Sequence, residues 1–188
     1  MIDKVNIPDG RIGVAEVRRF KVEDDELARV RALFNGGRYC PAGEYTMLKV
    51  RGQLVMSDTP DEMSDHWQAV RKAQGHCLIM GLGLGMVVTA IAKKPEVTKI
   101  TVIEIEQNVI DLVGPYMPEG VEIICADALE WQPPKGVRYG MVWHDIWSSM
   151  CVDQIPERSR LKRRFGRKAD WQGDWGREVI DRDRRRYG

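Results

Sequence analysis

The feature that most constrains this chain is a short apolar run that ends in alternating glycines. Residues 76–80 read His-Cys-Leu-Ile-Met, and residues 81–85 read Gly-Leu-Gly-Leu-Gly. Such a run predicts a buried strand that turns sharply into a helix. Glycine allows positive φ and lets a ligand approach the backbone closely. The free N–H groups at the start of the following helix would point at whatever binds in the turn.

Glu104 adds a second element of the same site. It ends the apolar run at residues 99–104, where an acidic side chain can accept hydrogen bonds from two ribose hydroxyls. The glycine turn and this acid predict a pocket for an adenosine-containing cofactor. Met86 stands where dinucleotide-binding proteins need a small residue, which argues against a dinucleotide. A P-loop is excluded, because no Lys-Ser or Lys-Thr pair follows the glycines.

Two more predicted strands deliver polar residues to the same place. The strand at residues 121–125 runs into Asp127 and Ala128, and the strand at residues 137–143 runs into His144 and Asp145. Ligands of open parallel sheets bind at the carboxyl ends of the strands. We therefore expect these side chains, Glu104 and the glycine turn to line one crevice.

The Gly-x-Gly-x-Gly turn, Glu104, Asp127 and Asp145, in this order after successive strands, resemble the motifs of class I S-adenosylmethionine (SAM) dependent methyltransferases. The resemblance implies SAM or S-adenosylhomocysteine (SAH) as cofactor and a methyl acceptor that the sequence does not name. In that family the acid after the third strand faces the adenine amino group, and the next backbone N–H reads the ring. The implied cofactor-binding residues are Met80, Gly81, Leu82, Gly83, Gly85, Glu104, Ile105, Asp127, Ala128 and Asp145.

A closer resemblance covers residues 45–147. The run Leu-Val-Met-Ser-Asp-Thr-Pro-Asp-Glu at residues 54–62, then His66, the glycines, and Tyr-Met-Pro at residues 116–118, is similar to spermidine synthases. The cofactor-binding glutamine of that family would fall at Met56, with Gln53 three residues away. The residues that follow the matching acid in that family are also different here, because Ile-Trp-Ser follows Asp145. The chain also resembles small phage-encoded proteins of the class I methyltransferase type, through its Asp-Ile-Trp and Trp-Gln-Gly runs.

Three functions stay open at this point. The leading one is a SAM-dependent methyltransferase, and the second is another SAM-using enzyme that transfers aminopropyl groups or cleaves the cofactor. The third is a SAM-binding protein without turnover. Methyl transfer is an in-line displacement, so a protein mainly aligns the reactants and supplies a base where the nucleophile must lose a proton. Asp145 is the first candidate base, and His144 is the second because its ordinary pKa lies near neutral pH.

The expected organisation is a single domain over residues 1–188. Residues 1–75 should contain a strand at 11–20, a helix at 23–34, a hairpin turning at Arg51-Gly52, and a helix capped by Thr59 with a capping box to Glu62. Residues 76–147 form the cofactor-binding core. Residues 148–188 show no strand pattern and predict helices at 156–165 and 170–186. The fold class is therefore α/β, a Rossmann-like parallel sheet of the class I methyltransferase type, truncated after the fourth strand, with an N-terminal hairpin and C-terminal helices.

Charge and cysteine content bound the partners and location. Residues 157–188 carry a net charge of +6, although the chain as a whole is near neutral at +1. We interpret this basic extension as a solvated helical face, with nucleic-acid contact as the alternative. A homodimer is left open by the exposed sheet edge that a four-stranded core would have. Four scattered cysteines and the lack of a membrane-spanning run predict a cytoplasmic protein. The three histidines share no metal-ligand spacing, so no metal site is expected.

Overall fold

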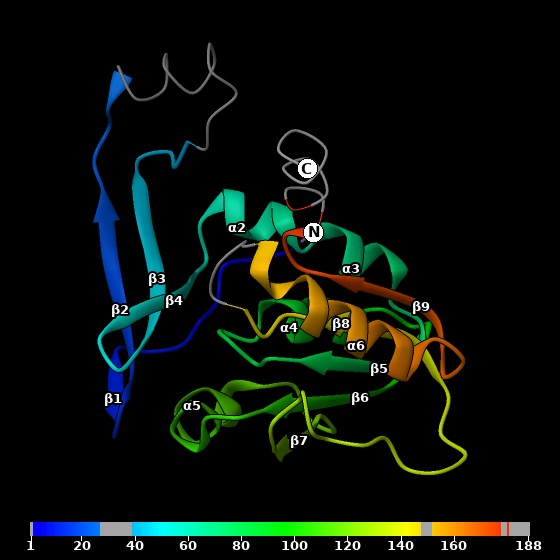
Figure 1. Cartoon of the computed structure of the whole chain (residues 1–188). Coiled ribbons are helices and arrows are strands. Elements are labelled where there is room, and N and C mark those ends of the chain that lie inside the picture. Colours follow the sequence, from blue (N-terminus) through cyan, green and yellow to red (C-terminus); the bar gives the residue numbers. More distant parts are fainter. Residues whose placement is uncertain (1, 27–38, 148–151, 178–179, 181–188) are drawn as a thin grey trace.

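The computed structural model describes residues 2–26, 39–147, 152–177 and 180. Two sheets organise this part of the chain: an antiparallel sheet of four strands and a parallel sheet of five. Figure 1 shows the antiparallel sheet standing across the carboxyl ends of the strands of the helix-covered parallel sheet. The antiparallel strands are β1 (Gly10–Ile12), β2 (Ala15–Val22), β3 (Gly43–Val50) and β4 (Gln53–Ser57). The parallel strands are β5 (Gly75–Met80), β6 (Val97–Glu104), β7 (Glu122–Cys125), β8 (Tyr139–His144) and β9 (Ala169–Asp174).

The order of the parallel strands defines where a ligand can bind. The strands lie in the order β7-β6-β5-β8-β9, so the chain first winds outward from β5 and then returns to β8 on its other side. The reversal makes a topological switch point between β5 and β8, and open α/β sheets bind ligands at the carboxyl ends of the strands there. The α/β class and the Rossmann-like parallel sheet are thus confirmed.

Burial on both faces explains why β5 and β8 read as continuous apolar runs. All six residues of β8 are buried, as are the last four of β5. The helices α3 (Trp67–Lys72), α4 (Met86–Ala92) and α5 (Gln107–Val113) belong to the core that contains Cys77, Ile79 and Trp143. The opposite core contains Leu78 and Met80 and is covered by α6 (Ile155–Phe165).

The expected end of the sheet after the fourth strand is wrong. Residues 170–174, expected to begin a helix, belong to β9, which pairs in parallel with β8 along its length. Trp171 stacks on Trp143 with 6.3 Å between ring centroids and 7° between the planes. A side chain at Gly173 would collide with both rings, so glycine is needed for this packing. The helix predicted at residues 156–165 is confirmed as α6. Residues 178–179 and 181–186 of the other predicted helix lie outside the described residues.

The N-terminal region matches its prediction in outline. The hairpin is confirmed, with Arg51 and Gly52 both at positive φ in the turn between β3 and β4. The strand expected at residues 11–20 is two strands, β1 and β2, joined by a turn at Gly13. Most of the helix expected at residues 23–34 lies outside the described residues.

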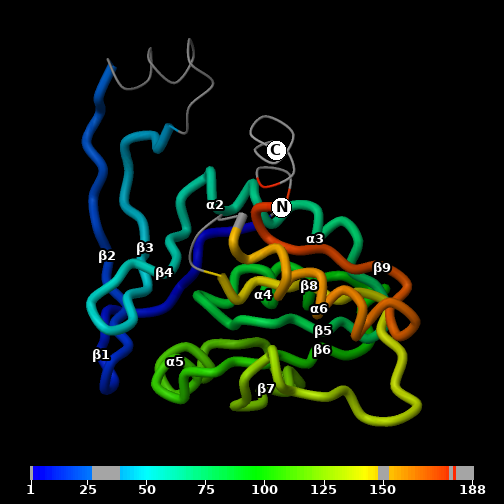
Figure 2. Tube along the Cα trace, viewed as in Figure 1, coloured from blue at the N-terminus to red at the C-terminus, as the bar shows by residue number. Residues whose placement is uncertain are grey.

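A helix follows the hairpin and begins at Pro60 behind Thr59 as predicted, but it is interrupted at His66 and its cap differs. It begins as α2 (Pro60–Asp65) and continues as α3 after His66, as the tube of Figure 2 shows. Thr59 occupies the N-cap position without a side-chain cap hydrogen bond. The carboxylate of Glu62 instead accepts hydrogen bonds from the N–H and hydroxyl of Ser57, at 2.6 and 3.0 Å. The predicted capping box is therefore wrong, because Glu62 ties the helix to the end of β4.

Candidate functional site

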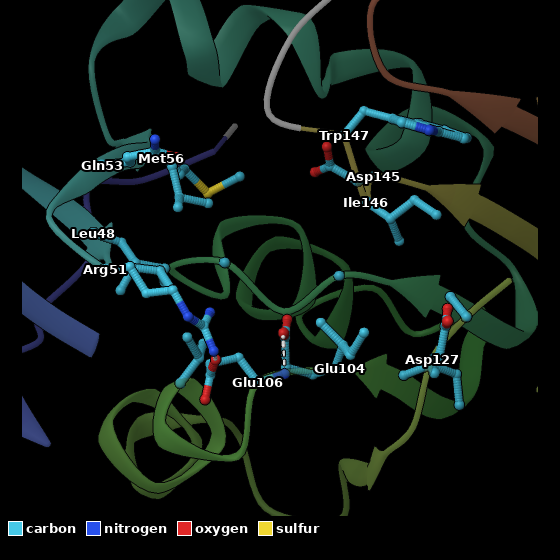
Figure 3. Close-up of a pocket in the computed structure, with 18 of the residues that line it drawn as sticks. Leu48, Arg51, Gln53, Met56, Glu104, Glu106, Asp127, Asp145, Ile146 and Trp147 are labelled. Atoms are coloured by element: carbon cyan, nitrogen blue, oxygen red, sulfur yellow. Dashed lines mark hydrogen bonds and ion pairs between the residues drawn. The ribbon is translucent and has the colours of Figure 1, made fainter. Parts of the chain in front are cut away.

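A cavity of about 660 Å³ opens at the carboxyl ends of the parallel strands, at the switch point between β5 and β8. Its size is that of a pocket for a cofactor-sized molecule. Segments that follow β5, β6, β7 and β8 all contribute to its wall, and the hairpin of β3 and β4 supplies the remaining side (Figure 3). The residues that the wall draws from the strand ends are Gly81, Gly83, Ile103, Glu104, Ile105, Glu106, Asp127, Ala128, Leu129, Asp145, Ile146 and Trp147.

The glycine turn is crowded from both sides. Gly81 has φ +96°, and a side chain there would overlap the carbonyl oxygen of Asp145. At Gly83, with φ +52°, an added Cβ would lie 2.6 Å from the sulfur of Met56. The turn between β5 and α4 is thus held between the loop after β8 and the hairpin, which only glycine permits.

Glu104 is fixed from two directions at the centre of the site. It is 9% exposed, and its Oε2 accepts a hydrogen bond from Leu82 N at 2.8 Å. Its Oε1 accepts one from Glu106 N at 2.9 Å. An ionised carboxylate has about four acceptor positions, so each oxygen can accept one more hydrogen bond. The pair of oxygens is preorganised to receive two neighbouring hydroxyl groups.

The segment after β7 supplies a polar and an apolar surface to the same cavity. Asp127 is exposed, and its Oδ1 accepts a hydrogen bond from Leu129 N at 2.8 Å. Ala128 beside it is buried. Ile105, which follows Glu104, is 66% exposed although it is apolar. Ile105 lines the cavity, so its exposed side chain offers an apolar surface to a ligand.

Asp145 lies across the glycine turn from Glu104 in the view of Figure 3. Its side chain is 10% exposed, and Oδ2 lies 3.6 Å from Nδ1 of His66. Burial raises the pKa of this carboxyl above its ordinary value, and the nearby His66 partly opposes the rise. Asp145 is therefore a better proton acceptor than an exposed aspartate.

His144 does not line the cavity. It is fully buried on the opposite side of β8 from Trp143, with Nδ1 3.0 Å from the sulfur of Met80 and Nε2 3.3 Å from Oε1 of Gln172. Burial lowers the pKa of His144 to about 4, so the imidazole is neutral at pH 7. The interpretation of His144 as a second base is thus corrected: it is a core residue.

Three further residues that the methyltransferase resemblance implies as cofactor-binding do not line the cavity. Met80 is fully buried against His144. Leu82 is buried and serves the site through its N–H, which Glu104 accepts. Gly85 begins α4 with φ +71°, and a side chain there would overlap Met117 instead of the cavity.

The hairpin of β3 and β4 was not predicted to be part of the site. Leu48, Leu54 and Met56 line the cavity, and Arg51 forms an ion pair with Glu106 at 2.8 Å. The signal was present, because the resemblance to spermidine synthases places a hairpin before the same core. Met56 stands where that resemblance expects a glutamine, and its sulfur lies 3.3 Å from Leu84 N.

Two further features are absent from the described residues. No group of three or more His, Cys, Asp or Glu side chains is arranged to hold a metal ion there. No helix of that part of the chain combines the length and apolar character needed to cross a bilayer.

No protein-family model and no curated protein sequence matches the chain. Solved structures resemble it at low identity. The N-methyltransferase NodS from Bradyrhizobium japonicum WM9 is 16% identical over 57% of this chain and 64% of NodS, with a TM-score of 0.45. A DhpI-SAM-HEP complex is 14% identical over 64% of this chain and 58% of DhpI, with a TM-score of 0.46.

The plantazolicin methyltransferase BpumL in complex with SAH is 17% identical over 63% of this chain and 46% of BpumL, with a TM-score of 0.44. The matched region thus spans less than two thirds of each of these proteins. Similarity at this level carries no functional argument. The class of the chain, an α/β protein with a Rossmann-like parallel sheet, rests on its strand order.

Proposed function

We propose that the chain binds SAM and transfers its methyl group to an acceptor. The observation that carries the proposal is the convergence of four strand ends on one cavity, with the buried Glu104 held by two backbone N–H groups at its centre.

The residues of the cavity fit such a cofactor. Glu104 would accept hydrogen bonds from the ribose hydroxyls, and Asp127 with the Ala128 N–H would read the adenine edge. Ile105 would pack on the face of the ring. The cofactor supplies an electrophilic methyl group on a sulfonium. The chain excludes water through the hairpin, holds the acceptor near the glycine turn, and offers Asp145 as the group that orients or deprotonates it.

Calorimetric titration with SAM and SAH tests the binding site. Glu104→Ala removes a charged acceptor of two hydrogen bonds and should weaken binding by about 1.5–3 kcal/mol. That loss is a roughly 10- to 150-fold increase in Kd. Glu119→Ala, an exposed acid outside the cavity, is the matched control and should leave Kd unchanged. No binding by the unmodified protein, or equal losses in both variants, would refute the assignment.

A second candidate, aminopropyl transfer, is favoured by one observation. The hairpin that the spermidine synthase resemblance expects does form a wall of the cavity, with Gln53 and Met56 both in it. Product analysis after incubation with SAM, and separately with decarboxylated SAM, distinguishes the candidates. Methyl transfer releases SAH, whereas aminopropyl transfer or cleavage of the cofactor releases methylthioadenosine. Binding without any product would favour a SAM-binding protein without turnover.

A further inference from the structure

The turn after β7, which the proposed function assigns to adenine, is built without a helix. Residues 126–138 connect β7 to β8; all of them are described, and none lies in a helix or strand. Parallel strands are usually connected by a helix, whose carbonyl groups accept hydrogen bonds from its own backbone. In this turn the Asp127 carbonyl accepts hydrogen bonds from Glu130 N at 3.0 Å and Trp131 N at 2.7 Å. The carbonyl groups that follow Asp127 need partners from elsewhere in the fold.

Arg164 of α6 provides these partners. Its Nη1 donates hydrogen bonds to the carbonyl oxygens of Ala128 at 3.0 Å and Trp131 at 2.9 Å. Its Nη2 donates one to the carbonyl oxygen of Leu129. The guanidinium is a planar fork of donors in fixed directions, so three bonds to one turn fix the orientation of its peptide groups. A lysine ammonium, on a flexible stem, does not impose a plane in this way.

The helix that carries Arg164 is itself fixed. Leu161 and Phe165 of α6 are fully buried, so the helix cannot shift without opening the core. A second polar contact between α6 and the turn is the ion pair of Arg160 with Glu130 at 2.9 Å. It joins two exposed side chains and contributes little. Arg164 is therefore the polar contact that ties the turn to the core helix.

One peptide group connects Arg164 to the cavity. The carbonyl of Ala128, which accepts a hydrogen bond from Arg164, and the N–H of Leu129 belong to the same planar peptide group. That N–H donates to Oδ1 of Asp127 at 2.8 Å, and Asp127 lines the cavity. In Figure 3, Asp127 lies to one side of Glu104, the residue proposed to hold the ribose. Arg164 thus orients the Asp127 carboxylate although it does not itself line the cavity.

We propose that Arg164 is a positioning residue whose hold on the turn makes the cavity select adenine over hypoxanthine. The inference deepens the proposed SAM site and rests on it. Adenine presents an amino group that donates and a ring N1 that accepts, which match the Asp127 carboxylate and the Ala128 N–H. Hypoxanthine presents a carbonyl and an N1–H at the same places. Acceptor would then face acceptor and donor would face donor, which rejects the wrong base.

This selectivity depends on the direction of hydrogen bonds, so a small rotation of the turn should reduce it. The carboxylate of Glu104 is held by Leu82 N and Glu106 N, which Arg164 does not contact. Loss of the Arg164 fork should therefore spare the ribose contacts and weaken an adenine ligand more than a hypoxanthine ligand. A general loss of stability would instead weaken both ligands alike.

Calorimetric titration with SAH and with its deaminated analogue S-inosylhomocysteine measures the selectivity. The unmodified protein should bind SAH at least about tenfold more tightly, because a hydrogen bond to a charged group is at stake. In Arg164→Lys, which keeps the charge, the preference should fall below about threefold, chiefly through weaker SAH binding. Arg163→Lys, at an exposed position of the same helix outside the cavity, is the matched control and should keep the full preference.

The outcomes separate this inference from the proposed function. Full preference for SAH in Arg164→Lys would show that packing alone orders the turn, and would overturn the inference. An equal loss of preference in Arg163→Lys would overturn it too. SAH binding by the unmodified protein without any preference would overturn the inference and leave the proposed cofactor site standing. No binding of SAH by the unmodified protein would overturn both.

Should Arg164→Lys fail to fold, the reciprocal effect is measured in the unmodified protein. A ligand whose affinity depends on the contacts of Arg164 must in turn strengthen those contacts. Saturating SAH should slow hydrogen exchange of the Arg164 side-chain N–H groups and of the Leu129 amide, followed by NMR, at least about threefold more than saturating S-inosylhomocysteine does. Equal slowing by the two ligands would overturn the inference.

Discussion

The assignment of His144 as a buried core residue, and not a catalytic base, can be tested quantitatively. Burial lowers its pKa from 6.5 to about 4 in the folded protein. The unfolded chain therefore binds a proton on this side chain between these two pH values, and the folded protein does not. Folding stability contributed by the neutral imidazole is fully present above pH 6.5 and is lost progressively as the pH falls toward 4.

The size of the effect follows from the shift. A difference of about 2.5 pH units corresponds to a total of about 3 kcal/mol, since one unit is worth about 1.4 kcal/mol. Between pH 7 and pH 5 the expected loss is about 2 kcal/mol, because most of the unfolded molecules are protonated at pH 5. Below pH 4 both states are protonated, and the loss should level off.

Urea unfolding of the unmodified protein and of His144→Gln, at pH 7 and pH 5, measures this loss. Other groups titrate in both proteins, so the informative quantity is the difference between the two pH dependences. The unmodified protein should lose about 2 kcal/mol more than the variant. SAH affinity at pH 7 should be the same in both, because His144 does not line the cavity. Parallel pH dependences, or a selective loss of SAH affinity in His144→Gln, would refute the assignment to the core.

Three further predictions concern the frame of the site. Gly81→Ala should lower the free energy of unfolding by at least about 2 kcal/mol more than Gly52→Ala in urea titrations, because both positions have positive φ but only Gly81 is crowded. Arg158→Met leaves a buried carboxylate poorly paired and should cost about 3 kcal/mol, whereas Arg160→Met, at an exposed ion pair, should cost less than about 1 kcal/mol in the same assay. Deleting residues 168–188 should leave an insoluble protein by sedimentation, because it removes β9 and exposes the edge of β8; a soluble, folded product would contradict this.

The parallel core could be predicted because its signals are local. The apolar runs of β5 and β8 are buried on both faces, and a run of that kind is visible in the sequence. The glycine turn and Glu104 were placed by spacing alone, and both line the cavity. These features depend on residues that are close together in the chain, so no knowledge of tertiary contacts was needed.

β9 could not be predicted because its stability comes from distant partners. Its sequence, Ala-Asp-Trp-Gln-Gly-Asp, has neither an apolar run nor a clean alternation. Gln172 is satisfied by His144, and the buried Asp174 by Arg158 and Lys162 of α6. Without such partners, burial of these polar side chains would lower the stability of the fold. The helix predicted over residues 170–186 therefore does not begin at residue 170, because Trp171 lies in β9.

The error over His144 has a different cause. Successive residues of a strand point to opposite faces. An error of one residue in the predicted end of a strand therefore decides whether a side chain is assigned to the cavity or to the core. The predicted strand ended at Trp143, which placed both His144 and Asp145 in the loop. β8 extends through His144, and Asp145 is the first residue beyond it. The carboxylate thus reaches the cavity, whereas the imidazole enters the core beneath α6.

One short segment, residues 104–108, connects the N-terminal sheet to Glu104. Glu106, whose N–H is accepted by Glu104, pairs through its side chain with Arg51 of the hairpin. Asn108 accepts a hydrogen bond from Val14 N at 3.2 Å, next to the start of β2. Arg51 N in turn donates to Val14 O at 2.9 Å, which closes the connection. The hairpin is therefore positioned over the glycine turn by the same residues that follow Glu104, so the wall of the cavity and its central carboxylate are set by one piece of backbone.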